Sequence, residues 1–359
     1  MSANARRQST YIIKLPLPNT LRSGIHVIDA IFAVVVEIED DDGVGVGYCY
    51  SFGEPEARAT QILADELLHR IADEDWHDVV GLYTRLWKSI NHVGQAGPPL
   101  IALAAIDIAL WDLHAKRAGL PLYQMWGGGH ATVPAYASGG WLSYSIDELL
   151  EEATSFTSLG FKAYKMKVGS IDVASDVARV TRVQEAVGSG VKIMVDANQA
   201  YQRWDALRAG REFQELGVYW LEEPVHSADF EGSAQIAAAL DMRVATGETV
   251  FGVAALKGLV TSRAADVMMP DVTCSGGLTP MRRVVSLMDV EHLEVAPHLF
   301  PEISAHVMAS VETGGRLVEF MPRWWKGFLS EGPEIVDGDL VLTDRPGCGI
   351  EINPELPRL

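Results

Sequence analysis

Short apolar segments alternate with amphipathic segments along the last two thirds of the chain. From about residue 131, each apolar run ends in a polar or charged residue and is followed by a helical pattern. Runs of this length that are apolar on both faces are typical of parallel strands covered by helices. Their regular spacing of roughly 25 residues fits one strand, one helix and two loops, which predicts β/α units closed into a barrel. The runs are VPAYAS, AYKMKV, VKIMVDAN, VYWLEEP, RVATGE, ADVMMPD, LEVAPH and RLVEF.

The first 130 residues follow another pattern. Apolar segments near residues 11–15 and 30–38, and a third at 45–52 behind the acidic turn EDDDG, predict a small antiparallel sheet. Helical patterns follow over residues 55–72, 79–88 and 98–117. The last of these has prolines at its start, basic residues in its last turn and Gly119 behind it, which are the expected boundary signals.

A chain of 359 residues exceeds one ordinary core, so we expect two units. An α+β unit would occupy residues 1–130, and the barrel would occupy residues 131–323. The tail, residues 324–359, contains the turn-rich stretch DGDLVLTDRPGCGI and is expected to return to the N-terminal unit.

Composition narrows the class of protein. The net charge of −19 argues against a nucleic-acid partner, because no basic face can easily dominate such a surface. Cys49, Cys274 and Cys348 are too scattered for a disulfide framework, which fits a reducing cytosol. The N-terminus has no apolar stretch typical of a signal peptide, and no run of about 18 apolar residues predicts a membrane span. We therefore expect a cytoplasmic location.

Ionisable residues gather at the predicted carboxyl ends of the strands, which surround one mouth of a β/α barrel. Asp196, Glu222 and Glu248 end three consecutive strands and form a natural cage for Mg²⁺, a hard cation that prefers oxygen ligands. Alternatively, each carboxylate caps the following helix or pairs with a lysine. Glu223 alternates to the other face of its strand and is expected to be structural.

Two further groups suggest acid–base chemistry. Lys165 and Lys167 are two positions apart on one strand, so they share a face, and two neighbouring ammonium groups should lower the pKa of one of them towards that of a useful base. Exposed, solvated lysines are the alternative. Asp271 and His298 end adjacent strands, so the aspartate could orient the imidazole and stabilise its cation.

The ordered combination of these motifs resembles the mandelate racemase branch of the enolase superfamily, in the mandelate racemase/muconate lactonizing enzyme family. The residues on which this resemblance rests are the KxK pair, the acidic trio in MVDAN, WLEEP and ATGE, the MPD aspartate and the APH histidine. The helix AAIDIALWDLHAKRAGLPLYQMWGG and the segment HLFPEISAH also resemble the family, so the resemblance covers nearly the whole chain. It implies a modified (β/α)7β TIM-like barrel and an α+β capping domain that the C-terminal tail completes.

The resemblance also implies residue roles. Asp196, Glu222 and Glu248 match Mg²⁺ ligands. Lys167 matches one catalytic base, and His298, supported by Asp271, matches the base on the opposite face. The remaining matches concern the substrate: Lys165 as the cation beside its carboxylate, Glu319 as an acid that hydrogen-bonds that carboxylate, and Asn198 and Ser138 as polar contacts. The family's assemblies imply a homo-oligomer, an octamer or a dimer.

The implied reaction removes the proton alpha to a carboxylate and gives an enediolate. Reprotonation on the other face would give racemisation or epimerisation, whereas loss of a β-hydroxyl would give a 2-keto-3-deoxy acid. The same motifs serve both outcomes, and a lactone cycloisomerase is a further alternative. The N-terminal loop holds Asn19, Thr20, Arg22, Ser23 and His26, donors suited to hydroxyls and a distal carboxylate. Arg22 and His26 are therefore candidate substrate contacts, and this loop favours dehydration of a sugar acid, with aldarates among the candidates.

Two other classes of function fit the sequence less well. A non-catalytic barrel that serves as a binding scaffold would be expected to lack some of the bases or ligands, and the complete rim counts against it. A metal-dependent hydrolase on a similar barrel would usually use several histidine ligands, but this rim has one histidine and an all-carboxylate trio.

Overall fold

The computed structural model describes residues 6–170, 172–311, 317–322 and 325–359. Its N-terminal unit is built on an antiparallel sheet of β1 (Arg7–Arg22), β2 (Val27–Asp40) and β3 (Gly43–Ser51). The central strand β2 is buried on both faces over most of its length, which explains its continuous apolar run. Gly45 and Gly47 of β3 lie against the backbone of a helix, where a Cβ atom would come within 2.2 and 2.1 Å of carbonyl oxygens. These two glycines allow the close packing of that helix on the sheet.

The helix on the sheet is α3 (Pro98–Ala118), which follows α1 (Glu54–His69) and α2 (Val79–Ser89) and precedes the short α4 (Leu122–Met125). As the sequence predicts, α3 begins with proline and ends at Gly119 in the left-handed conformation, with φ of +66°. Among the described helices, α3 alone is long and apolar enough to cross a membrane by length and composition. Its apolar stretch is 78% buried inside the protein, so here it is a core helix.

The second unit is a barrel of eight parallel strands. The strands are β4 (Thr132–Gly139), β5 (Ala163–Lys167), β6 (Lys192–Asp196), β7 (Trp220–Glu222), β8 (Arg243–Thr246), β9 (Val267–Met268), β10 (Glu294–Val295) and β11 (Val318–Phe320). They pair in chain order, and β11 pairs with β4. A hydrogen bond from Leu317 N to Val295 O joins β10 to the β11 segment and closes the barrel.

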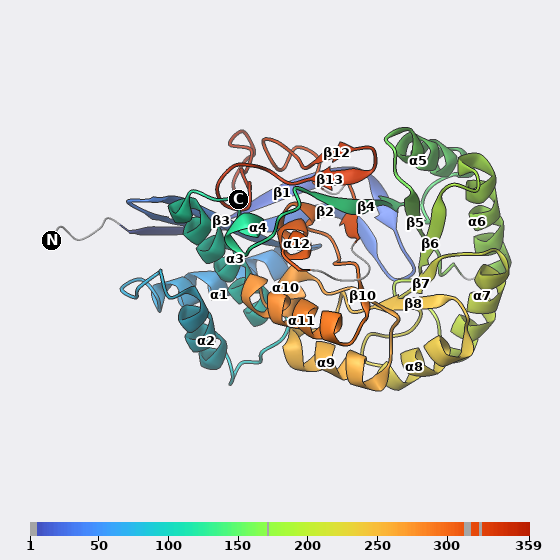
Figure 1. Ribbon diagram of the computed structural model, residues 1–359, viewed down its shortest axis with the longest axis horizontal. Coiled ribbons are helices and arrows are strands. Elements are labelled where there is room, and N and C mark those ends of the chain that lie inside the picture. The colour runs from blue at the N-terminus through green and yellow to red at the C-terminus, as the bar shows by residue number, and fades with distance from the viewer. Residues whose placement is uncertain (1–5, 171, 312–316, 323–324) are drawn as a thin grey trace.

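In the described part of the chain, seven helical connections cover the barrel, and several of them form the outer arc in Figure 1. The helices are α5 (Ile146–Ser158), α6 (Val173–Val187), α7 (Arg203–Glu215), α8 (Phe230–Ala239), α9 (Gly252–Ser262), α10 (Val272–Ser275) with α11 (Leu278–Val290), and α12 (Pro301–Ala309). The predicted (β/α)7β fold with an N-terminal α+β unit is confirmed.

Side chains fill the barrel interior and form a floor beneath the mouth. Each of the first seven strand segments contributes at least one of them, and Tyr136 and Trp220 meet edge to face with their ring centres 5.2 Å apart. The cluster consists of Tyr136, Ala163, Met194, Trp220, Ala245, Val267, Met269 and Ala296. The barrel is therefore a packed core with chemistry confined to its rim.

The C-terminal tail differs in part from the expectation. Its hairpin of β12 (Glu334–Val336) and β13 (Asp339–Val341) extends the barrel sheet, because β13 pairs antiparallel with β4. The tail then crosses to the N-terminal unit, where Cys348 N donates to Asp112 and Leu359 N donates to Ile12 O. The expected boundary at 323/324 lies outside the described residues, so the three-part division stays a prediction.

Buried polar contacts fasten the N-terminal unit to the barrel. Asp107 of α3 accepts hydrogen bonds from the backbone N–H and hydroxyl of Thr279, at the start of α11, both at 2.7 Å. Trp111 donates to the same hydroxyl at 2.8 Å. Burial raises the pKa of Asp107 to about 7 despite these bonds.

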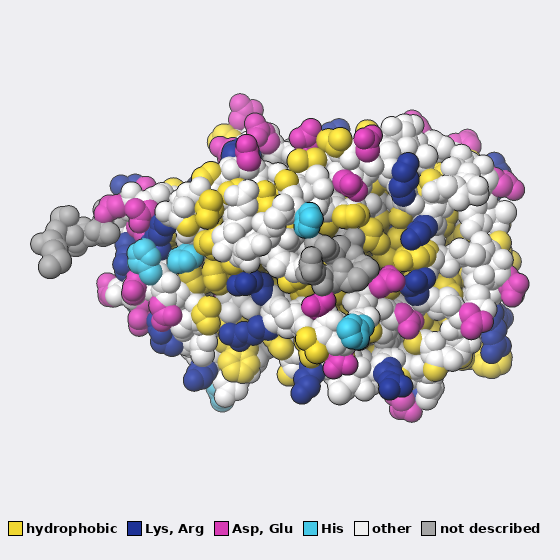
Figure 2. Space-filling view, viewed as in Figure 1, with side chains coloured by type: hydrophobic (Ala, Val, Ile, Leu, Met, Phe, Trp, Pro, Cys, Tyr) yellow, Lys and Arg dark blue, Asp and Glu magenta, His cyan; other side chains and the backbone are white. Residues whose placement is uncertain are grey.

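On the face in Figure 2, acidic and basic side chains are interspersed with apolar ones, so the net charge of −19 is not gathered into one acidic field there.

His306 makes folding sensitive to acid. It is fully buried, accepts a hydrogen bond from Tyr123 N through Nδ1 and faces Cys348 O through Nε2, at 3.2 Å each. Burial lowers the pKa of His306 from 6.5 to about 4. The unfolded chain therefore binds the proton more readily than the folded protein. Stability from this group is present above pH 6.5 and is lost as pH falls towards 4, by about 3 kcal/mol in total.

We predict that His306→Gln, which can keep an acceptor and a donor without titrating, removes this loss. Urea unfolding at several pH values between 7 and 4 measures it. His77→Gln, at an exposed histidine, is the control and should keep the wild-type pH dependence. An unchanged acid dependence in His306→Gln contradicts the assignment.

Candidate metal and acid–base site

Strand register brings the three predicted metal ligands together. Asp196 at the end of β6 pairs with Glu222 at the end of β7, and Glu248 lies two residues beyond β8. Gly247 precedes Glu248 with φ of +135°, a conformation open mainly to glycine. Asp196 and Glu222 are fully buried and Glu248 is 6% exposed. The ladder of parallel strands, rather than closeness in sequence, creates this cluster.

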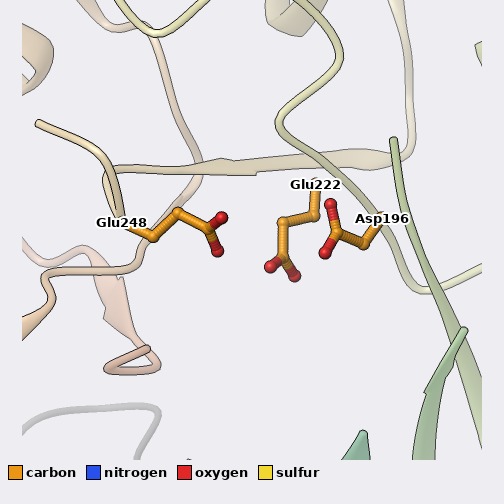
Figure 3. Close-up of side chains that lie close together, drawn as sticks. All are labelled: Asp196, Glu222 and Glu248. Carbon is orange, nitrogen blue, oxygen red and sulfur yellow. The ribbon is translucent and has the colours of Figure 1, made fainter. Parts of the chain in front are cut away.

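The cluster fits a hard divalent cation. One carboxylate oxygen from each residue lies within 4.8 Å of the others, and Figure 3 shows the three side chains converging from two sides on a common space. Glu248 Oε2 and Asn198 Oδ1 are buried without a hydrogen-bond partner among the described residues. A cation such as Mg²⁺ would satisfy buried oxygens that accept no hydrogen bond, and Glu248 Oε2 also lies 3.5 Å from His298 Nε2.

Both lysines point into this acidic cluster. Lys165 Nζ lies 2.5 Å from Glu222 and 2.8 Å from Glu319, and Lys167 Nζ lies 2.5 Å from Asp196. Burial opposes the charge of both lysines, but the carboxylates raise the pKa of Lys165 well above its ordinary value and also raise that of Lys167. The charge of Lys165 does lower the pKa of Lys167, as expected, but the predicted net lowering is wrong, because the carboxylates on neighbouring strands outweigh the like charge.

The Asp271–His298 pair forms as strand order predicts. The two residues bridge adjacent strands, and His298 Nδ1 lies 2.9 Å from Asp271 Oδ2. The other oxygen of Asp271 accepts from Thr273 N, Thr273 Oγ1 and Cys274 N, which fixes the carboxylate towards the imidazole. Burial lowers the pKa of His298, but Glu248 and Asp271 outweigh it and raise that pKa to about 10. The Nε2 atom lies 3.5 Å from Glu248.

Glu319 and Ser138 lie in the same buried region. Glu319 on β11 is fully buried and accepts a hydrogen bond from Leu299 N. Burial would raise its pKa, but Lys165 and then His298 lower it below the ordinary range. Glu319 is thus paired with Lys165, and its role as an acid that hydrogen-bonds the substrate carboxylate stays a prediction. Ser138 is opposite Lys165 in the register, and its buried hydroxyl has no hydrogen-bond partner among the described residues.

A cavity of about 370 Å³ opens above these groups. Its lining includes Lys167, Asn198, Glu248, Asp271 and His298, so it joins a candidate metal ligand to both candidate bases. A larger cavity, of about 520 Å³, lies between α12 and the tail, away from the acidic trio.

The β1–β2 hairpin forms part of the cavity wall. Its tip is a tight turn closed by a hydrogen bond from Ser23 N to His26 O, and Gly24 packs on the loop after β6, where a Cβ would lie 2.6 Å from Ala197 O. His26 lines the cavity, and burial followed by the charge of Lys167 lowers its pKa. Arg22 is exposed and is absent from the cavity lining. The structure therefore brings His26 to the site but not Arg22.

Several cavity residues were missed from the sequence. Most are aromatic or apolar and come from segments whose docking no local pattern reveals: Tyr50, Phe52, Ile101, Trp141, Phe251 and Met321. Trp141 carries one useful signal, because it follows the end of β4, and its ring faces Lys167 Nζ at 5.2 Å. The wall is more apolar than the polar residues of the N-terminal loop suggested.

The closed barrel, the acidic trio and the acid–base groups at its mouth define a class, the metal-dependent β/α-barrel enzymes. Comparison with known families narrows it. An "Enolase C-terminal domain-like" family model matches residues 148–356, and a "Mandelate racemase / muconate lactonizing enzyme, N-terminal domain" model matches residues 10–127. The chain belongs to the mandelate racemase/muconate lactonizing enzyme family of the enolase superfamily, which confirms the resemblance read from its motifs.

Similar proteins catalyse different reactions. L-talarate/galactarate dehydratase of Salmonella typhimurium is 36% identical over 296 residues, which are 82% of this chain and 74% of that protein. The 3,6-anhydro-alpha-L-galactonate cycloisomerase of Streptomyces coelicolor is 31% identical and covers 97% of both. The solved structure of the Salmonella dehydratase, liganded with Mg and L-lyxarohydroxamate, has a TM-score of 0.92 at 32% identity and covers 98% of this chain and 91% of that one.

We predict that Glu248→Gln weakens Mg²⁺ binding without unfolding the protein, because it neutralises one carboxylate at the rim of the cavity. A ligand at 100 times its Kd stabilises the wild-type fold by about 2.7 kcal/mol. Chemical denaturation with and without MgCl₂ should show this gain in the wild type and its loss in the variant. Glu151→Gln, at an exposed site on α5, should keep the gain. Equal stabilisation of both variants would exclude Glu248 as a ligand.

Proposed function

We propose that the protein is a magnesium-dependent lyase that abstracts the proton alpha to a carboxylate and then removes water from a sugar acid. The observation that carries the proposal is one cavity that Lys167, His298 and Glu248 line together, with the two candidate bases next to different members of the acidic trio. Lys167 contacts Asp196, and His298 lies 3.5 Å from Glu248. The similarity to a sugar-acid dehydratase liganded with Mg supports both the metal and the substrate class.

The residues have complementary tasks in this reaction. When bound, magnesium would neutralise the carboxylates that hold the lysines charged and stabilise negative charge on the substrate carboxylate. Lys167, once neutral, removes the alpha proton to its Nζ atom. Lys165 stays paired with Glu319 and presents a fixed positive charge, so the enediolate forms in a prepared electrostatic field.

His298 suits the second step. Asp271 holds the ring in position through Nδ1 and favours its protonated form. The β-hydroxyl can then leave with a proton from Nε2 as water while the electrons of the enediolate form the new C=C bond. The resulting enol tautomerises to the 2-keto-3-deoxy acid. Lys167 thus accepts the alpha proton and His298 supplies the proton that leaves with the hydroxyl.

A second candidate function is racemisation or epimerisation of a 2-hydroxy acid. The apolar part of the cavity wall, which includes Phe52, Trp141 and Phe251, favours this alternative more than the loop sequence did. A lactone cycloisomerase is a third candidate, supported by the similarity to the Streptomyces enzyme. All three reactions begin with the same proton abstraction.

We predict that the purified protein with MgCl₂ converts at least one sugar acid to a 2-keto product that reacts with semicarbazide. The library should contain aldonates and aldarates in matched stereochemical pairs, since Arg22 no longer argues for a second carboxylate. Lys167→Ala and His298→Asn should each lower turnover by about 10²-fold or more. Circular dichroism and Mg²⁺ binding show whether these variants remain folded and metal-competent.

Proton NMR in deuterated water separates the candidate functions. Exchange of the alpha proton with keto product supports dehydration, and exchange with inversion but without keto product supports racemisation. Absence of exchange across the library, or full activity in both variants, contradicts the proposed chemistry.

We further propose a cytoplasmic homo-oligomer, an octamer or a dimer, on the basis of family resemblance. Size-exclusion chromatography with light scattering gives the assembly state directly. A monomeric mass at assay concentrations would contradict the proposal.

A further inference from the structure

Three side chains form a closed hydrogen-bonded ring directly after the acidic trio, on the loops that follow β6, β7 and β8. Gln199 follows Asp196 by three positions, and Glu223 and Thr249 directly follow the other two carboxylates. Gln199 Nε2 donates to Glu223 Oε2 at 2.9 Å and to Thr249 Oγ1 at 3.0 Å, and Thr249 Oγ1 donates to Glu223 Oε1 at 2.9 Å. We call Gln199, Glu223 and Thr249 the loop ring. It connects the ends of β6, β7 and β8.

The backbone beneath the loop ring is held in an uncommon conformation. Asn198, Gln199 and Glu223 have φ values of +41°, +65° and +39°, a region that residues other than glycine rarely adopt. Such conformations persist where surrounding contacts impose them, and they cluster at functional sites. Here Gln199 N donates to Glu223 O at 2.7 Å, and Ser227 N donates to Gln199 Oε1 at 2.9 Å. The loop ring and these backbone bonds hold the two turns together.

We propose that the loop ring positions Asp196, Glu222 and Glu248 as a preformed cage and thereby sets the affinity of the protein for Mg²⁺. Its members are positioning residues, because they follow the metal ligands in the chain and their side chains hydrogen-bond to one another. Groups that orient metal ligands commonly change metal affinity or activity by about 10- to 100-fold when they are removed. This inference rests on the metal-binding part of the proposed function and is independent of the substrate.

Thr249 is the most informative member. Its hydroxyl accepts from Gln199 and donates to Glu223, so a single atom closes the loop ring. Valine has nearly the same shape but neither function, whereas serine keeps the hydroxyl. Glu223 is only 1% exposed, so water cannot readily replace the lost donor. Thr249→Val should therefore loosen the β7 and β8 ends relative to one another while leaving all three carboxylates in the chain.

The test measures Mg²⁺ binding to the metal-free full-length protein by isothermal titration calorimetry without substrate. We expect Thr249→Val to raise the Kd about 10- to 100-fold and Thr249→Ser to restore it to within about threefold of wild type. Ser233→Ala is the matched control, because Ser233 is 5% exposed and its hydroxyl donates to Ala264 O at 2.7 Å on the outside of the barrel. It should lose thermal stability without losing Mg²⁺ affinity.

Either of two results overturns the proposal: a wild-type Kd in Thr249→Val, or an equal rise of Kd in Ser233→Ala, which would indicate general destabilisation. If Thr249→Val does not fold, Gln199→Met breaks the loop ring at its other donor and must give the same weakening. Absence of sugar-acid turnover with normal Mg²⁺ binding would contradict the proposed reaction alone. The loop ring predicts that Thr249→Val binds Mg²⁺ more weakly, while the wild-type protein carries out the proposed reaction.

Discussion

The structure depends on how a group of buried charges is balanced at the barrel mouth. Asp196, Glu222, Glu248 and Glu319 bring more negative charge than Lys165 and Lys167 can neutralise, and Asp271 and His298 largely satisfy each other. Burying charge without compensation is costly. Burial, with the charges of Asp196 and Glu248, raises the pKa of Glu222 well above its ordinary value, although Lys165 opposes the rise. A divalent cation would supply the missing positive charge, so this imbalance of buried charge favours binding of the metal.

Strand order makes this arrangement possible. Lys167, Asp196 and Glu222 are direct neighbours across β5, β6 and β7, so a ladder of backbone hydrogen bonds sets their spacing. The interior floor around Trp220 supports them, and the Trp220 indole donates to Glu222 Oε2 at 3.0 Å. The N-terminal unit adds part of the cavity wall through the tip of its β1–β2 hairpin, which packs on the loop after β6 near Asp196. Strand ends thus carry Lys167, Asp196 and Glu222, whereas Glu248 lies in the loop after β8.

Much of this could be predicted because it follows local rules. The eight strands and the carboxylates at their ends were readable from apolar runs and spacing, since a β/α unit has a nearly fixed length. Features that depend on neighbouring strands in the sheet could not be predicted from the sequence. The pKa of Lys167 was misjudged because Asp196, on the next strand, outweighs the nearby lysine. Arg22 and His26 lie on the same hairpin, yet only His26 lines the cavity, which only the docked hairpin reveals. The β12–β13 pairing with β4 likewise required the assembled barrel edge.

The charge account can be tested most directly by a crystal structure of the protein grown with MnCl₂, with Mn²⁺ as an anomalous substitute for Mg²⁺. The account predicts one strong anomalous peak bonded to oxygens of Asp196, Glu222 and Glu248, with Lys165 and Lys167 at its side. A fully occupied Mn²⁺ elsewhere, or three carboxylates still paired with lysines at saturating Mn²⁺ and no peak between them, would contradict it.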